Sequence, residues 1–162
     1  MKRLLVLMSS TLLAPMLLAQ TTGYQDADSQ NEAIGYFRSQ MSAFEELQRQ
    51  CVSRFPDIAP AIQSRLDSWR QREADFVSKL TYHFDIMRKQ SPRESLKLEE
   101  MGKQSIAHLF SIINTTAKTN GLQSDTLERR MCLKQFEDLD AGAWRGRVPK
   151  AYAFIDALSV PH

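Results

Sequence analysis

The side chains that could carry out chemistry are few, and they are widely separated along the chain. Neither His83 nor His108 has a second metal-binding residue at helical spacing, and His162 is the last residue. A metal site needs several donors that converge on one point, so we expect no metal ion. The chain also has no glycine-rich phosphate loop and no serine-nucleophile motif. The sequence therefore predicts no cofactor and no catalytic site.

One carboxylate stands out from this background. Glu73 lies in a gap of an apolar helical stripe, between Trp69 and Phe76. A carboxylate on an apolar seam is costly unless it is paired with a cation. We therefore expect a buried ion pair between Glu73 and its neighbours Arg70 and Arg72. The alternative is that Glu73 belongs to a functional pocket.

The N-terminus has the layout of a secretory signal peptide. Lys2 and Arg3 are followed by an apolar run from Leu4 to Leu18, and Ala19 offers a small residue for cleavage. The run is too short for a spanning helix, which needs about 20 apolar residues. We predict cleavage after residues 1–19, export to the periplasm or beyond, and no stable membrane insertion of the product.

Removal of this segment changes the charge balance. The chain has 21 basic residues, of which two are lost, so the processed protein has 19 basic and 19 acidic residues. A neutral domain has no broad attraction for phosphate backbones, so nucleic-acid binding is not expected. Residues 20–30 are polar without periodicity, which predicts a flexible leader. The remaining residues 31–162 have the length and composition of a single folded domain.

Apolar residues recur at helical spacing along most of this domain, and no strand pattern competes with them. The predicted helices cover residues 34–51, 58–87, 92–120 and 125–139, and a short helix starts at Pro149. Helices joined by short turns would bury their apolar stripes against one another. The predicted fold is therefore an all-α antiparallel bundle of four main helices with a short C-terminal helix.

The two cysteines are expected to pair. Cys51 ends the apolar face of the first predicted helix, and Cys132 lies in the fourth. In an oxidising compartment such a pair normally forms a disulfide, which here would join two helices of the bundle. The alternative is two separate buried thiols that act as small apolar side chains. A redox role is not expected, because no Cys-x-x-Cys pair exists.

Two groups of cationic side chains are candidates for contact with another molecule. Trp144, Arg145 and Arg147 fall on a predicted loop flanked by glycines, and Trp and Arg are enriched where proteins bind one another. In the alternative reading, Trp144 folds back as a lid on the bundle. Arg65, Arg70 and Arg72 lie along one predicted helix. They form either a solvated face or a site for an acidic partner.

These features together favour an interaction protein over an enzyme. We expect an exported, non-enzymatic module that binds another protein in the periplasm, with immunity-type and envelope accessory proteins as the sub-classes to consider. The alternative is a carrier that holds a small apolar ligand or a lipid between its helices, because methionine and phenylalanine can line such a cavity.

Overall fold

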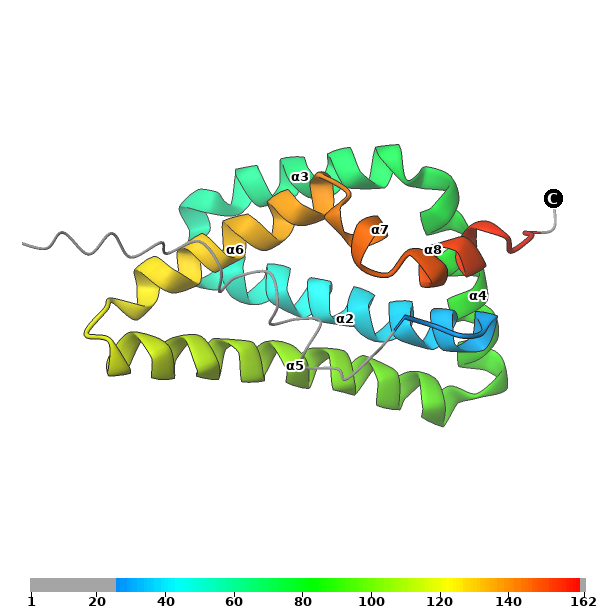
Figure 1. The fold of residues 1–162 in the computed structure, drawn as a ribbon, viewed down its shortest axis with the longest axis horizontal. Helices are drawn as coiled ribbons and strands as arrows, with labels where there is room; N and C mark the ends of the chain where they lie inside the picture. Colours follow the sequence, from blue (N-terminus) through cyan, green and yellow to red (C-terminus); the bar gives the residue numbers. More distant parts are fainter. Residues whose placement is uncertain (1–25, 161–162) are drawn as a thin grey trace, which may run out of the picture.

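The computed structural model describes residues 26–160, and these residues form an all-helical bundle without strands (Figure 1). The predicted signal peptide, the first part of the predicted leader and His162 lie outside the described residues. The elements in chain order are α2 (Gln30–Arg54), the 3-10 turn η1 (Pro56–Ile58), α3 (Ala59–Arg72), α4 (Ala74–Gln90), α5 (Pro92–Thr119), α6 (Ser124–Asp140), α7 (Ala143–Arg147) and α8 (Pro149–Asp156). The predicted all-α bundle is confirmed.

Helix α2 is the centre of the bundle. Its N-terminus is capped by the Ser29 hydroxyl, which accepts a hydrogen bond from the backbone N–H of Glu32 at 3.2 Å. Its buried residues run along the whole helix, from Ala33 to Cys51, so the helix is covered by neighbours on several sides. Figure 1 shows α5 along one side of α2 and the α3 and α6 layer along the other.

Helices α2, α3, α5 and α6 alternate in direction along the chain, and α4 crosses the end of the bundle (Figure 1). Consequently α2 and α5 run parallel to each other, as do α3 and α6, while α2 and α6 run in opposite directions (Figure 1). The parallel α2 and α5 approach closely at Gly102. A Cβ atom added there would lie 2.2 Å from the Ser39 carbonyl oxygen and 2.9 Å from the Ala43 nitrogen. Only glycine fits at this crossing.

The second predicted helix, over residues 58–87, is interrupted in the structure, and the prediction of one continuous helix is wrong. Glu73 leaves helical geometry (φ −101°, ψ 26°) and separates α3 from α4. The two halves of the apolar stripe, on α3 and on α4, face different neighbours. On α4, Phe76 stacks on Tyr152 of α8 and meets Phe37 of α2 edge to face. The bend lets α4 cover the end of the bundle.

Part of the segment predicted as a flexible leader has a defined place. The Asp26 carboxylate accepts hydrogen bonds from the backbone N–H groups of Lys150 and Ala151, both at 2.9 Å, and thereby caps the start of α8. Ala27 is buried beside it. The helical domain therefore includes Asp26, because its carboxylate accepts from two N–H groups in the first turn of α8 that have no acceptor within the helix.

Candidate functional site

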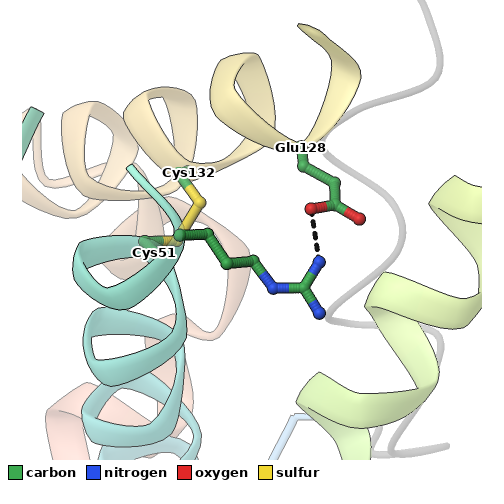
Figure 2. Close-up of a disulfide and its surroundings, with 4 residues drawn as sticks. Cys51, Glu128 and Cys132 are labelled. Atoms are coloured by element: carbon green, nitrogen blue, oxygen red, sulfur yellow. Dashed lines mark hydrogen bonds and ion pairs between the residues drawn. A yellow bond between two sulfur atoms is a disulfide. The ribbon is translucent and has the colours of Figure 1, made fainter. Parts of the chain in front are cut away.

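The predicted disulfide is present and joins α2 to α6. Cys51 and Cys132 are bonded, their Cα atoms are 5.8 Å apart, and both residues are fully buried (Figure 2). The alternative of two separate thiols is wrong. The bond connects residues 81 positions apart, so it links the first main helix to the last.

A buried carboxylate lies next to this bond. Glu128, one helical turn before Cys132 on α6, is 2% exposed and appears close to the disulfide in Figure 2. Its Oε2 accepts a hydrogen bond from Arg54 Nη1 at 2.5 Å, and the Arg54 guanidinium also covers the Phe110 ring at 4.6 Å. This pair ties α2, α5 and α6 together. The sequence analysis missed it, because no local spacing links residues 54 and 128.

Glu73 is ion-paired, but its main partner is not one of the two predicted arginines. Arg145 Nη2 lies 2.6 Å from Glu73 Oε2, whereas the adjacent Arg72 lies 3.6 Å away. Arg70 points elsewhere and pairs with Asp67 at 3.6 Å on the exposed surface. Arg70 is therefore wrong as a partner of Glu73. The helix break at Glu73 turns its carboxylate toward α7, which the continuous helix assumed from the sequence would not do.

Arg145 has further contacts that fix it in place. It donates a hydrogen bond to Asp156 at 2.8 Å, and its guanidinium lies over the Tyr152 ring at 4.5 Å. The hydrogen bonds from Arg145 to both carboxylates raise the pKa of this guanidinium above its ordinary value. Arg145 therefore connects the α3–α4 bend with α8 and acts as a structural bridge.

Trp144 and Arg147 also serve the interior of the bundle. The predicted glycine-flanked loop is the short helix α7, which starts after Gly142 in the left-handed conformation (φ 71°). Trp144 is 3% exposed and meets Phe44 edge to face at 5.6 Å, as the lid reading expected. Arg147 pairs with Asp138 at 3.0 Å. In this conformation these three residues do not form an open contact surface.

The arginines on α3 are likewise used within the bundle. Arg65 and Arg72 both pair with Asp140 of α6, at 3.0 Å and 3.2 Å. Hydrogen bonds to Asp140 from Ser68, Arg65 and Arg72 hold the pKa of its carboxyl below the ordinary value. The α3 face thus packs on α6 through the charges of Arg65 and Arg72, whereas Arg70 pairs with Asp67 of its own helix.

The described residues contain no cluster that could hold a metal ion. No group of three His, Cys, Asp or Glu side chains converges within residues 26–160. Burial raises the pKa values of Tyr36 and Tyr152 above the ordinary value. Among these residues, a hollow between α3 and α6 offers about 50 Å³, and a second one between α2 and α5 has no room for a water molecule.

One surface region stands out because it gathers three cations that have no ion-pair partner among the described residues. We define the α4–α5 corner as Lys89 in the last turn of α4 together with Arg93, Leu96 and Lys97 in the first turns of α5. All four side chains are exposed, and Leu96, at 63%, is more exposed than the other exposed large apolar side chains of the described residues, Leu122 (54%) and Met101 (41%). The sequence analysis did not single out this region, because exposure depends on how α4 and α5 pack.

Comparison with known proteins does not assign this fold to a family. No family model matches the chain, and neither the curated proteins nor the solved structures contain a match. Within the described part, no helix combines the length and apolar character needed to cross a bilayer.

Proposed function

We propose that the processed chain is an exported, non-enzymatic protein of the periplasm that binds another envelope protein. The observation that carries this proposal is the buried Cys51–Cys132 disulfide. Disulfides persist in oxidising compartments and are rare in reducing ones. Together with the signal-peptide pattern of residues 1–19, the bond supports export.

The way in which the bundle uses its charges supports a binding role. Side chains that could act in catalysis are held in inter-helix ion pairs, among them Glu73, Arg145, Glu128 and Asp138. These pairs and the disulfide favour a rigid scaffold with a fixed surface. A pre-organised surface binds a partner without a large loss of conformational entropy. Immunity-type and envelope accessory proteins remain the proposed sub-classes.

The carrier alternative gains no support from the interior. A site for a drug-sized apolar ligand occupies about 300–1,000 Å³. The hollow between α3 and α6 offers about 50 Å³, far below this range. Most of the methionine and phenylalanine side chains that suggested a carrier lie in the apolar core or pack against it, with Phe37, Phe44 and Phe136 in the core.

The test is in vivo crosslinking of the tagged protein in its own cell, followed by purification and identification of the crosslinked partner. A second exported, disulfide-bonded helical protein, tagged in the same way, serves as the control. We expect one envelope protein to be enriched over the control and to bind the purified chain in isolation. Enrichment of no protein over the control, in repeated experiments at two crosslinker lengths, would contradict the proposal.

A further inference from the structure

We propose that the α4–α5 corner docks the folded protein reversibly onto an anionic phospholipid surface. The corner brings three cations and one leucine to a sharp turn, because the single residue Ser91 connects α4 to α5. Lys89, Arg93 and Lys97 are exposed, and none forms an ion pair with a described residue. Leu96 lies between Arg93 and Lys97 on the helix and is 63% exposed.

The corner carries a net positive charge. Residues 85–97 contain four cations and two anions, and one of those anions, Asp85, is already paired with Arg88 at 2.7 Å. The remaining anion, Glu94, has no ion-pair partner among the described residues and reduces the charge only in part. The bundle is neutral as a whole, so this local excess sets the orientation in which the protein meets a negative surface.

The opposite end of the bundle gives a useful contrast. There, Leu122 in the turn between α5 and α6 is 54% exposed. The nearest cation in sequence without an ion-pair partner among the described residues is Lys118. Each Lys or Arg near an anionic membrane contributes about 1 kcal/mol, or about fivefold in binding. Three cations beside one leucine therefore favour docking through the α4–α5 corner over docking through the other turn.

The size of the patch favours a lipid surface over a protein partner. A stable protein interface buries about 800 Å² on each side around an apolar centre. A turn with a single strongly exposed leucine does not provide such a centre. A membrane surface requires no matching shape, since cations and one inserted apolar side chain act additively at its headgroups.

The experiment measures co-sedimentation of the protein with vesicles. The oxidised protein is purified after export, its N-terminus is read by mass spectrometry, and it is mixed with vesicles of phosphatidylcholine with or without phosphatidylglycerol. We expect binding only to the vesicles that contain phosphatidylglycerol, and a loss of binding as the salt concentration rises.

Two sets of variants locate the contact. Replacement of both Arg93 and Lys97 by Gln should lower the partition coefficient about 25-fold, and Leu96→Ser should lower it about 10-fold. The matched control combines Lys118→Gln with Leu122→Ser at the opposite end and should leave binding unchanged. All of these side chains are exposed, so unfolding curves should coincide with the wild type.

Three outcomes would overturn the inference. These are no binding of the wild type to phosphatidylglycerol vesicles, equal binding to phosphatidylcholine alone, and an equal loss in the control variant. A photo-crosslinker at position 96 that captures a protein in cells, while the purified chain ignores vesicles, would assign the corner to a protein contact instead. The inference is separate from the proposed protein-binding function, which the crosslinking experiment tests on its own.

Discussion

At the scale of single residues, the molecule uses charge to hold helices together. Glu73, Glu128 and Asp138 are all largely shielded from solvent, and each is paired with an arginine from another helix. A shielded carboxylate is costly without such a partner, so the loss of either member should destabilise the fold. Exposed pairs such as Asp67–Arg70 contribute much less.

A double-mutant cycle separates these two kinds of pair. Glu73→Gln and Arg145→Gln, alone and combined, should give a coupling free energy of about 1–2 kcal/mol, because the two groups lie 2.6 Å apart and Glu73 is 10% exposed. The control cycle, Asp67→Asn with Arg70→Gln, should give about 0–0.5 kcal/mol. Urea unfolding of the wild type and the six variants provides the measurement. Equal coupling in both cycles would refute the structural role of Arg145.

The lowered pKa of the Asp138 carboxyl predicts how the free energy of unfolding depends on pH. Burial tends to raise the pKa of Asp138, but hydrogen bonds from Lys134 and Arg147 outweigh it, so the folded pKa lies below the ordinary value. A lowered folded pKa stabilises the fold above the unfolded pKa of about 3.9, and this contribution disappears as the pH falls through the folded value.

Unfolding free energies between pH 7 and pH 2 test this point. Asp138→Asn should lower stability at pH 7 by about 1–2 kcal/mol, and should weaken the decline toward acid pH. If the variant declines as steeply as the wild type, other carboxylates, such as Asp140 and Glu99, are responsible for the acid sensitivity.

At the scale of helices, close packing and capping decide where elements sit. The α2–α5 contact depends on Gly102, where any side chain would collide with the backbone of α2. The position of α8 depends on Asp26, a residue 124 positions away from the first N–H that it accepts. Both features connect elements that are distant in the sequence.

Gly102→Ala tests the close approach of α2 and α5. The added Cβ would lie 2.2 Å from the Ser39 oxygen, so the helices must separate, and we expect a loss of about 3 kcal/mol. Gly146→Ala is the matched control, because a Cβ there meets nothing within 4 Å and alanine favours helix. Thermal unfolding compares the two. Equal midpoints would contradict the packing described for α2 and α5.

Asp26→Ala tests the cap on α8. Loss of the two hydrogen bonds should cost about 1 kcal/mol and should speed amide hydrogen exchange at Lys150 and Ala151 before other sites. Asp28→Ala is the control, since its pair with Lys150 is exposed on both sides and should contribute almost nothing. Unchanged exchange at the two amides would show that Asp26 does not hold α8.

Much of the helical architecture could be predicted from the sequence, because burial imposes a periodic apolar pattern on each helix. The pattern located the main helices, and the disulfide followed from two cysteines in an expected oxidising compartment. The pattern could not reveal the bend at Glu73, since Trp69 and Phe76 stay seven residues apart whether or not the helix is continuous. Trp144 and Arg145 resembled contact residues because their partners, Phe44 and Glu73, come from distant segments.

At the scale of the whole molecule, the disulfide fixes the first main helix to the last. A cross-link over 81 positions restricts the unfolded chain strongly, so reduction should lower the free energy of unfolding by about 4 kcal/mol. Guanidinium unfolding with and without reductant measures this difference. A change below about 1 kcal/mol would mean that the bond contributes little beyond what packing provides.

The same bond connects the fold with the proposed location of the protein. Cys51 and Cys132 are both fully buried, so we expect the disulfide to form before or during the final packing of α6 onto α2. Disulfides persist in oxidising compartments and are rare in the cytosol. Export, oxidation and folding are therefore parts of one prediction about this chain.

The most direct test is intact-mass analysis of the protein isolated from its native cell, with free thiols blocked at lysis. The account predicts that the envelope fraction contains a chain that begins at Gln20, with Cys51 and Cys132 unavailable to the blocking reagent until reduction. A chain that retains Met1–Ala19, is found in the cytosol and has both cysteines blocked at lysis would contradict the account.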